Sequence, residues 1–533
     1  MQIKNKIDLY TIGIVIILVF SFIIRTYNLS SNPAGFFADE ASVSIDAYSI
    51  MKTGADRNGD FFPLFFKGFN FDNVSPYQVY LTVPFVALFG LNETAVRLTP
   101  VFWSTVELLI FYLLLAALLS KPYALIGTIM LSLSPWHFHI SRINMGDYYS
   151  WTLLTLLAYL FLVYGFKNGK TYPFLISAIF FGLATYSYTP ARLTTPLLFV
   201  LTLSILLLKK YLRITLLMIF IYMTILIPFL HFHITDPHSL QRLRDTAGID
   251  IRSQNTVKPN TSSLTAQFFN KYFLHYSDLF LFQKGDADFP GQFLRRHSIP
   301  GLGLLYPYQK IIIVIGLVWL MVKIIKMKKY ELLFIIYLLF LFPVADSITS
   351  DKTPFSTRSY LGVLPFHLLI AFGINGIYQL LQKSLITKIN FMRILFILFS
   401  LYLVLSSGFT LFKNFNDAPK TTSDFWGWQF GPRDIMKYFL SVKDSYDDLY
   451  MSGEFNAGHI FISFYDPKNT CESKCKMGDF FREPQIYNPS KRQLFSLSPD
   501  YLSKSQFARN FLVKKTIYYP NGTIAFQIGE IVK

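Results

Sequence analysis

The chain has 533 residues, of which 52% are hydrophobic and 18% aromatic, while only 15% are charged. A soluble globular protein carries about 25% charged residues, so this composition, with its apolar residues in long blocks, indicates an integral membrane protein. The formal net charge of +17 does not indicate nucleic-acid binding, because the basic residues lie in short clusters between hydrophobic spans, as in cytoplasmic loops that face anionic lipid.

The first hydrophobic span covers residues 9–24 and follows Lys4 and Lys6. No small-residue cleavage site follows it, so the span is predicted to be a retained anchor rather than a removed signal peptide. The two lysines place the N-terminus in the cytoplasm.

The next stretch, residues 36–54 (FFADEASVSIDAYSIMKTG), lies in a predicted outer loop at 25–95 and is expected to form a short helix that ends at Gly54. It holds the adjacent acids Asp39 and Glu40 beside the bilayer, where carboxylates are costly and tend to mark function. Two interpretations of Asp39 are open at this point: a helix cap or a catalytic acid.

The topology depends on residues 77–89, which are apolar but short and broken by Pro84. A crossing needs about 20 residues, so this segment is predicted to be interfacial or re-entrant. The remaining spans are then expected at 96–119, 123–140, 149–166, 172–188, 193–208, 214–230, 310–325, 332–348, 360–381 and 392–407. This arrangement puts nearly every short basic loop on the cytoplasmic side, and it predicts an α-helical polytopic membrane protein of about eleven transmembrane helices with its C-terminus outside.

Two long outer regions complete the organisation: a loop at 231–309, and a tail at 409–533 that follows a membrane-embedded domain of residues 1–408. The tail is predicted to be a small extracytoplasmic α/β domain, with a helix at 432–443, strand-like runs such as HIFISFY, and a hairpin turn at Pro520-Asn521-Gly522. The two cysteines, Cys471 and Cys475, form either a small disulfide loop or two free thiols, and they lack companion ligands for a zinc site.

Every residue that could perform chemistry lies on the predicted outer side. Clustered acids and bases at one membrane face suit a charged, lipid-linked substrate, because arginine matches phosphate oxygens and a carboxylate can accept a hydroxyl proton. The ordinary alternatives are also open: a basic residue at a helix end can reach the lipid head groups, a tyrosine can belong to the interfacial belt, and an acid can cap a helix. The candidates are Asp39, Glu40, Arg142, Asp147, Tyr186, Tyr188, Arg192, His297, Lys352 and Arg358.

Several blocks of sequence resemble a known family. FFADEASVSIDAYSI, YQVYLTVPFVALFGLNETAVRL, SPWHFHISR, YSYTPARL, LFLFQKGDADFPGQFLRRHSIPGLG and TRSYLGVLPF are similar to blocks in bacterial relatives of the dolichyl-phosphate-mannose protein mannosyltransferases. The resemblance implies the many-helix fold of the C-type glycosyltransferases, with a polyprenyl-phosphate sugar as donor. It also implies that Asp39 and Glu40 form the acidic motif of the first outer loop, and that Asp147 is the acid at the start of the fourth span. The tail shows no repeated sugar-binding trefoil, in contrast to the eukaryotic members.

The resulting hypothesis is an inverting glycosyltransferase (a hexosyl or pentosyl transferase) at the outer face of the plasma membrane. Asp39 with Glu40 would act as general base, and Asp147 is a third catalytic candidate. The lipid phosphate would be held by Arg358, Lys352, Arg192 or Arg142, and the pocket would include Tyr186, Tyr188 and His297. The acceptor would be a hydroxyl on a lipid, glycan or protein. No ligand spacing indicates a metal, although carboxylates near a phosphate are compatible with a divalent cation.

Two other classes of protein compete with this hypothesis. A transporter or lipid flippase could use the same acids as a coupling-ion or head-group site, but transporters usually keep polar residues near the bilayer midplane, where these spans are mostly uncharged. A non-catalytic scaffold for the tail would leave the acidic helix without a purpose.

Overall fold

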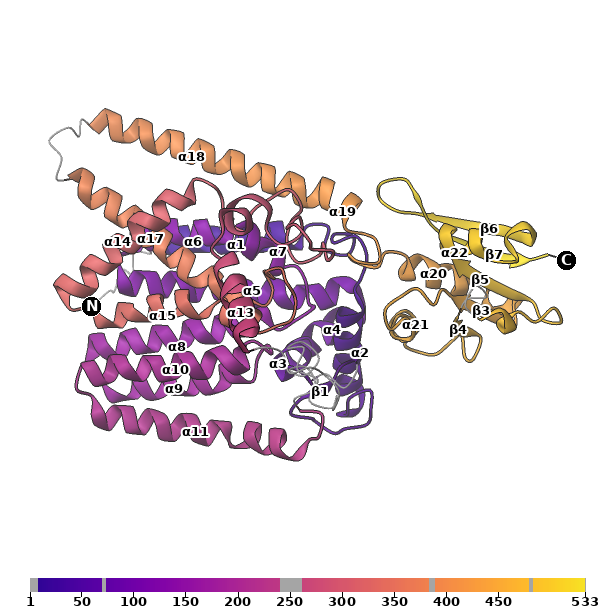
Figure 1. Cartoon of the computed structure of the whole chain (residues 1–533), viewed down its shortest axis with the longest axis horizontal. Helices are drawn as coiled ribbons and strands as arrows, with labels where there is room; N and C mark the ends of the chain where they lie inside the picture. The colour runs from indigo at the N-terminus through magenta and orange to yellow at the C-terminus, as the bar shows by residue number, and fades with distance from the viewer. Residues whose placement is uncertain (1–7, 70–72, 240–260, 383–388, 479–482, 533) are drawn as a thin grey trace, which may run out of the picture.

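The computed structural model describes residues 8–69, 73–239, 261–382, 389–478 and 483–532. Figure 1 shows two parts, a large helical bundle and a smaller domain with a β-sheet at one end of it. The predicted fold class, a polytopic helical membrane protein with a C-terminal α/β domain, is confirmed.

Membrane-crossing helices make up most of the bundle. Within the described ranges, seven stretches are long and apolar enough to cross a bilayer. They are α1 (Leu9–Thr26), α5 (Glu93–Leu118), α8 (Tyr148–Asn168), α10 (Ala191–Leu208), α11 (Leu212–Thr235), the stretch Tyr330–Ser347 with α15 (Leu333–Leu341) and α16 (Val344–Ser347), and the stretch Tyr360–Leu381, most of which is α17 (Val363–Gln382).

Four predicted spans have a different form. The span at 123–140 is broken into α6 (Lys121–Ser132) and α7 (Pro135–Ile140), because the residue before a proline avoids helical backbone. The span at 172–188 is the shorter α9 (Thr171–Thr185). The span at 310–325 is α14 (Gln309–Met327), which has lysines at both ends. The span at 392–407 is α18 (Ile389–Phe412), which runs along the edge of the bundle (Figure 1). The expected number of about eleven crossings therefore stays a prediction.

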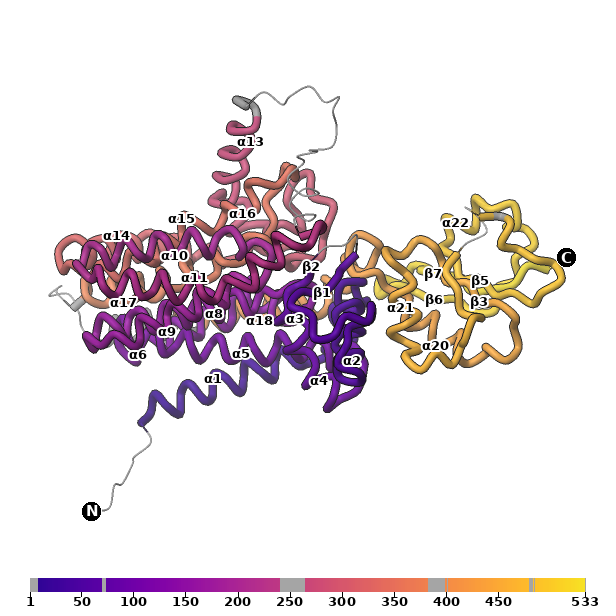
Figure 2. Tube along the Cα trace, turned by 90° about the horizontal axis from the view of Figure 1, so that it is seen from below, coloured from indigo at the N-terminus to yellow at the C-terminus, as the bar shows by residue number. Residues whose placement is uncertain are grey.

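The described residues of 25–95, the predicted first outer loop, fold against the end of the bundle next to the C-terminal domain (Figures 1 and 2). The acidic helix is α2 (Ala38–Thr53), and it ends at Gly54, whose φ of +75° is the left-handed helix stop that the sequence predicts. The segment at 77–89 forms two short helices, α3 (Pro76–Tyr80) and α4 (Val83–Phe89). At about 1.5 Å per residue neither can cross a bilayer. A two-stranded hairpin, β1 (Phe66–Lys67) and β2 (Asn73–Val74), completes the loop.

The second outer region contains α13 (Thr261–Leu274), which projects from the side of the bundle (Figure 2), and a π-helical turn, η2 (Leu279–Lys284). Residues 240–260 of this region lie outside the described residues.

The C-terminal domain follows α18 through η5 (Lys413–Asp417) and α19 (Ala418–Thr421). Its sheet has the order β4-β3-β5-β7-β6, with β3 parallel to both of its neighbours and the β5–β7 and β6–β7 pairs antiparallel. The strands are β3 (Asp448–Met451), β4 (Cys475–Met477), β5 (Gln493–Leu497), β6 (Phe511–Tyr518) and β7 (Ile524–Ile531), and the helices are α20 (Pro432–Val442), α21 (His459–Tyr465) and α22 (Pro499–Lys504).

Two of the three predicted elements in this domain are confirmed: the helix at 432–443 is α20, and the turn at Pro520-Asn521-Gly522 joins β6 and β7. The assignment of HIFISFY as a strand is wrong, because this run is the helix α21. Its buried residues, Ile460, Phe461 and Phe464, share one face of a helix, and this packing overrides the β-preference of the side chains.

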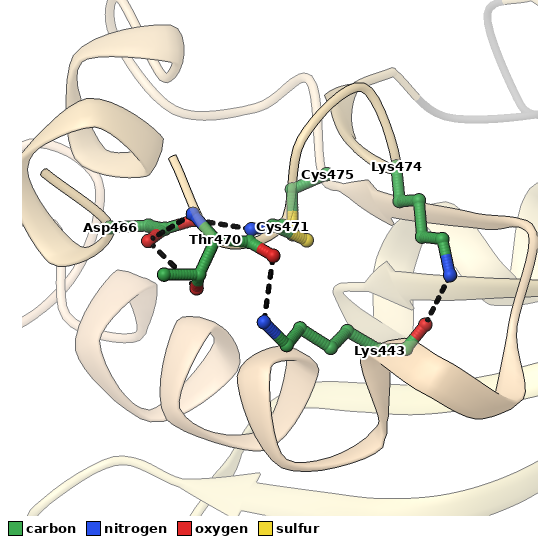
Figure 3. The surroundings of a disulfide bond; sticks show 6 residues. All are labelled: Lys443, Asp466, Thr470, Cys471, Lys474 and Cys475. Carbon is green, nitrogen blue, oxygen red and sulfur yellow. Dashed lines mark hydrogen bonds between the residues drawn. A yellow bond between two sulfur atoms is a disulfide. The ribbon is translucent and has the colours of Figure 1, made fainter. Parts of the chain in front are cut away.

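The two cysteines form a disulfide in the C-terminal domain (Figure 3). The loop between them is held by neighbouring bonds: the Asp466 carboxylate accepts the backbone N–H groups of Thr470 and Cys471 at 2.9 and 2.7 Å, and Lys443 Nζ donates to the Thr470 carbonyl at 2.7 Å. Of the two states left open by the sequence, the structure therefore contains the disulfide, which is typical of an oxidising compartment.

Candidate active site

A cavity of about 320 Å³ opens where the first helical turn of α2 meets the end of the bundle. Its walls come from α2, the β1–β2 region, α3, the turn before α8, the turn after α9, the second outer region and the C-terminal domain. The lining residues include Phe37, Asp39, Ser42, Phe69, Asn73, Ser75, Gln78, Asp147, Tyr188, Arg296 and Asn456. Of the ten residues that the sequence singles out, Asp39, Asp147 and Tyr188 line this cavity.

The side chain of Asp39 is half-buried at the start of α2. The N-cap residue of this helix is Phe37, whose backbone is extended with φ −77° and ψ 150°, so Asp39 occupies the second helical position and is not the N-cap residue. A carboxylate in the first turn is stabilised as an anion by the helix dipole. Of the two interpretations of Asp39, this position therefore favours a charged group that faces the cavity over a helix cap.

Glu40 points elsewhere and forms a buried ion pair. Its carboxylate accepts two bonds from the Arg97 guanidinium, at 3.0 and 2.8 Å, and a third from the backbone N–H of Asn144 at 3.1 Å. Both side chains are fully buried, and Glu40 is not among the cavity-lining residues. Because its oxygens are occupied by these donors, Glu40 is placed to hold α2 on α5 rather than to accept a substrate proton.

Asp147 lies directly before α8 and is fully buried. The Ser75 hydroxyl donates to its Oδ2 at 2.6 Å, which ties α8 to the loop before α3. Burial raises the pKa of Asp147 to about 6, while the Ser75 and Ser150 hydroxyls act in the opposite direction. The side chain makes no cap bond to the helix.

Arg296 is a charged cavity-lining residue that is not among the ten candidates from the sequence. Its guanidinium stacks 3.9 Å from the ring centroid of Phe37 and donates to the Trp426 carbonyl at 2.9 Å. Burial lowers the pKa of Arg296, and the negative charge of Asp39 opposes that shift. Within the run Arg295-Arg296-His297, nothing in the sequence distinguishes the arginine that faces the cavity from its exposed neighbour.

The four basic residues expected to bind phosphate do not line the cavity. The buried Arg142 donates to the carbonyls of Arg25, Tyr27 and Asn32, and Arg192 donates to the Asn73 carbonyl at 3.0 Å. Arg358 pairs with Asp346 and Asp351, and Lys352 is exposed. The phosphate assignments of all four residues therefore stay predictions, and the guanidinium groups of Arg142 and Arg358 have partners within the protein.

The three expected pocket residues have different environments. Tyr188 lines the cavity and packs edge-on against Tyr148, with 4.9 Å between ring centroids. The Tyr186 hydroxyl donates to the Ile225 carbonyl at 2.6 Å, and Tyr186 does not line the cavity. His297 does not line it either: its buried ring lies against Asp286 at 3.7 Å and Phe355, and burial near Arg296 holds its pKa well below the ordinary value. The pocket roles of Tyr186 and His297 stay predictions.

A second group of buried polar residues lies within the bundle and is also missed by the sequence analysis. Arg25, at the end of α1, contacts His137 Nδ1 at 2.9 Å, and the other ring nitrogen of His137 lies 3.6 Å from the carboxylate of Glu107 in α5. The hydropathy pattern indicates spans that are mostly uncharged in their middle, but these buried groups show that the spans contain ionisable residues. Ionisable residues inside membrane spans are usually paired with one another. None of the three residues lines the cavity.

A search of the described ranges for clusters of three or more His, Cys, Asp or Glu side chains that could hold a metal ion found none. The carboxylates of Asp39 and Asp147 share the cavity without a third ligand of these types among its described lining residues. The cavity therefore offers anionic, cationic and hydroxyl groups for acid–base chemistry and for binding a polar ligand.

Comparison with known proteins gives a family for part of the chain and a fold for nearly all of it. Residues 73–232 match the family model described as dolichyl-phosphate-mannose-protein mannosyltransferase. No curated protein sequence matches. The family match agrees with the resemblance inferred from the sequence over this part of the chain, and the structural matches show a shared fold.

Solved structures match over nearly the whole of this chain. The first is ArnT from Cupriavidus metallidurans in the apo state, with 13% identity, a TM-score of 0.54, and coverage of 98% of this chain and 99% of that one. ArnT bound to undecaprenyl phosphate matches with 12% identity, the same TM-score and 98% coverage of both chains. The apo oligosaccharyltransferase of Archaeoglobus fulgidus matches with 11% identity, a TM-score of 0.54, and coverage of 98% and 75%. Together with the family match, this fold supports a membrane glycosyltransferase.

Proposed function

We propose that this protein is an inverting glycosyltransferase that moves a sugar from a polyprenyl-phosphate donor to a hydroxyl acceptor at the outer face of the membrane. The observation that carries the proposal is the cavity at the start of α2, where the carboxylates of Asp39 and Asp147 and the guanidinium of Arg296 come together from three distant segments. Support for the donor comes from ArnT and the archaeal enzyme, whose structures contain undecaprenyl phosphate and dolichol-phosphate.

In the proposed reaction, the acceptor hydroxyl attacks the anomeric carbon of the donor sugar. The new oxygen–carbon bond forms as the carbon–oxygen bond to phosphate breaks, and the polyprenyl phosphate leaves with the bonding electrons. Asp39 takes the hydroxyl proton as general base. Its place in the first turn of α2 favours the ionised form that this role needs.

Arg296 is proposed to bind the phosphate as it leaves. Arginine donors match phosphate oxygens in geometry and charge, and such charge-assisted bonds stabilise the negative charge that develops on the leaving group. The side chain is fixed by its stacking on Phe37 and its bond to Trp426, so the charge is positioned before the donor binds. Arg358, Lys352, Arg192 and Arg142 stay as further candidates for the phosphate contact, although none of them lines the cavity.

The other residues of the cavity support this chemistry. Asp147 is proposed to orient the donor or acceptor through the bond network that it shares with Ser75, and Tyr188 provides an aromatic wall. Glu40 is proposed as a positioning residue, because its ion pair with Arg97 fixes the helix that carries Asp39. A divalent cation is not part of the proposal.

A binding measurement tests the phosphate assignment. In lipid nanodiscs, Arg296→Ala is expected to weaken the binding of undecaprenyl phosphate by roughly 10- to 100-fold, the size of one or two charge-assisted hydrogen bonds. The matched control is Arg295→Ala, which removes the exposed neighbouring arginine and should bind like the parent. Equal affinities for all three proteins would refute the role of Arg296.

The second candidate function is a transporter or lipid flippase, and the buried group of Arg25, His137 and Glu107 favours it, because such groups mark ion pathways in membrane proteins. The two functions differ in a simple observation. A glycosyltransferase converts a polyprenyl-phosphate sugar to free polyprenyl phosphate, whereas a flippase moves the same lipid between leaflets without changing it.

A further inference from the structure

We infer that the C-terminal domain forms the acceptor side of the cavity, and that Asn456 and Phe69 bind the acceptor as an uncharged saccharide. This inference rests on the proposed glycosyltransferase function and adds the acceptor class to it. Among the described residues that line the cavity, Asn456 is the one that comes from the C-terminal domain. Phe69 belongs to the first outer loop.

Asn456 lies on a short connection, residues 452–458, between β3 and α21. Its side chain is exposed, whereas Phe455 beside it is buried, with its ring centroid 5.9 Å from that of Phe461 and 5.1 Å from that of Phe526. The next residue, Ala457, has a φ of +47°, which a residue with a side chain adopts at a cost. The anchored and strained turn thus holds Asn456 outward from the domain and into the cavity.

Hydrogen bonds also fix this turn in advance of binding. The carboxylate of Glu454 accepts bonds from the Ser452 hydroxyl at 3.1 Å and from the Ser498 hydroxyl at 2.8 Å. Ser498 follows β5, so the turn is fastened to the sheet of the domain. A binding group on a preformed turn loses little conformational entropy when a ligand binds.

The domain also contacts the catalytic helix and the opposite wall of the cavity. Phe36, directly before the N-cap of α2, packs on Phe464 of α21 with 4.7 Å between ring centroids, in a shared hydrophobic core. His459, the first residue of α21, lies edge-on to the ring of Phe69 at 6.5 Å. The C-terminal domain therefore supplies Asn456 to the cavity lining and contacts the ring of Phe69 through His459.

The position of these groups favours the acceptor over the donor. The prenyl chain of the donor has to stay in the bilayer, which the helical bundle spans, while the C-terminal domain lies beyond the end of that bundle (Figure 1). The carboxylates and Arg296 come from the bundle and its loops, and Asn456 faces them across the same cavity. A group on the domain side is therefore placed to meet the molecule that arrives from outside the membrane.

The chemistry of the two side chains favours a saccharide. An asparagine amide both donates and accepts hydrogen bonds, so it can pair with two neighbouring sugar hydroxyls at once. The face of a pyranose ring that carries C–H groups packs well on an aromatic ring, and Phe69 and Tyr188 both line the cavity. An anionic acceptor would find one basic residue, Arg296, among the described residues that line the cavity, and Arg296 already faces Asp39. The nearby Arg57 lies over the ring of Phe69 and donates to Ser42.

The test uses the full-length protein in nanodiscs, undecaprenyl-phosphate-mannose as donor, and uncharged disaccharides or a serine-containing peptide as acceptors. Asn456→Ala is expected to raise the KM for the disaccharide about tenfold, the effect of one lost hydrogen bond. The affinity for undecaprenyl phosphate and the rate at saturating disaccharide should stay within about twofold of the parent values. Gln506→Ala, which removes another exposed amide of the same domain outside the cavity lining, is the matched control and should behave like the parent.

Three results would overturn the inference: a parental KM in Asn456→Ala, an equal loss of affinity for undecaprenyl phosphate, or transfer to the peptide but not to any disaccharide. Donor turnover in the absence of acceptor keeps this outcome separate from the proposed function. A parent protein that consumes no donor at all, even by hydrolysis, would refute the glycosyltransferase itself. If the parent consumes donor and the variant matches it in KM, only the acceptor assignment fails.

Discussion

The adjacent acids Asp39 and Glu40 have opposite environments because neighbouring side chains on a helix point about 100° apart. Asp39 is half-buried and lines the cavity, whereas Glu40 is fully buried against Arg97. The acid pair therefore divides into a group presented to a substrate and a group that fixes the helix. The different roles of Asp39 and Glu40 follow from the structure and could not be predicted from two consecutive acidic residues in the sequence.

The buried ion pair gives the first prediction. Glu40→Gln leaves the Arg97 guanidinium buried without its counter-charge, and breaking such a pair commonly costs about 3–5 kcal/mol. We expect a clearly lower melting temperature in nanodiscs. The control is Lys67→Ala, which breaks the exposed pair with Asp60 and should cost less than about 1 kcal/mol. A parental melting temperature for Glu40→Gln would contradict the structural role of Glu40.

Asp147 gives a prediction about pH. Because burial raises its pKa from 3.8 to about 6, ionising Asp147 costs more in the folded protein than in the unfolded chain. Its contribution to stability is therefore present below about pH 4 and is lost as the pH rises through about 6, by on the order of 3 kcal/mol.

Asp147→Asn removes this titration, so the fall in melting temperature between pH 4 and 7 should be smaller in the variant than in the parent. Asp60→Asn, at a side chain that is 48% exposed, serves as the control and should keep the parental slope. An unchanged slope in Asp147→Asn would show that Asp147 is not desolvated as the structure indicates.

Part of the site could be predicted at the residue scale. The sequence identifies Asp147 and Tyr188 because each stands beside the end of an apolar span, and it identifies Asp39 because two adjacent acids lie in a short helix beside the bilayer. It cannot separate Arg296 from Arg295, since both follow the same loop and only the tertiary fold turns one toward Asp39. It also cannot show that Arg142 and Arg358 are satisfied by partners far along the chain or across a loop.

At the scale of single elements, α2 is predicted well and α21 is not. Gly54 provides a clear stop for α2, since its left-handed backbone suits glycine. The run HIFISFY is rich in residues that prefer strands, but it is short, and its packing decides its structure. Phe464 of α21 packs against Phe36, which directly precedes the N-cap residue of α2. This contact between distant segments cannot be predicted from the sequence of either helix.

The contact between α2 and α21 gives an element-scale prediction. Phe464→Ala removes a buried ring from the core that Phe36 shares with the C-terminal domain, a change that typically costs about 3–5 kcal/mol. We expect faster amide hydrogen exchange along α2, together with slower sugar transfer. Phe507→Ala, in a separate cluster of the same domain, should leave the exchange of α2 unchanged. Parental protection of α2 in Phe464→Ala would mean that the domain does not support the helix.

At the scale of the whole molecule, the start of α1 and the C-terminal domain lie at opposite ends of the helical bundle (Figure 2). Helix α1 begins at the end far from the C-terminal domain (Figure 2), and Asp8 at that start pairs with Lys121 at the start of α6. The predicted topology, in which short basic loops gather on the cytoplasmic side, stays a prediction. Lys4 and Lys533, which mark the two predicted sides, lie outside the described residues.

The topology is tested with reporters fused after Lys533. An enzyme that is active only outside the cytoplasm, such as a secreted phosphatase, should be active there, and a reporter that needs the cytoplasm should be silent. The reverse pattern would place the cavity on the cytoplasmic side and would contradict the proposed reaction at the outer face.

Asp39 is the proposed general base, and the substitution Asp39→Asn gives the sharpest test of this role. The substitution keeps the shape and hydrogen bonding of the side chain and removes its ability to accept the hydroxyl proton. General-base catalysis contributes about 10²–10⁴ in rate, so Asp39→Asn should lose at least about 100-fold in sugar transfer, with an unchanged melting temperature and unchanged affinity for undecaprenyl phosphate. A folded Asp39→Asn protein that transfers sugar at the parental rate would contradict the account.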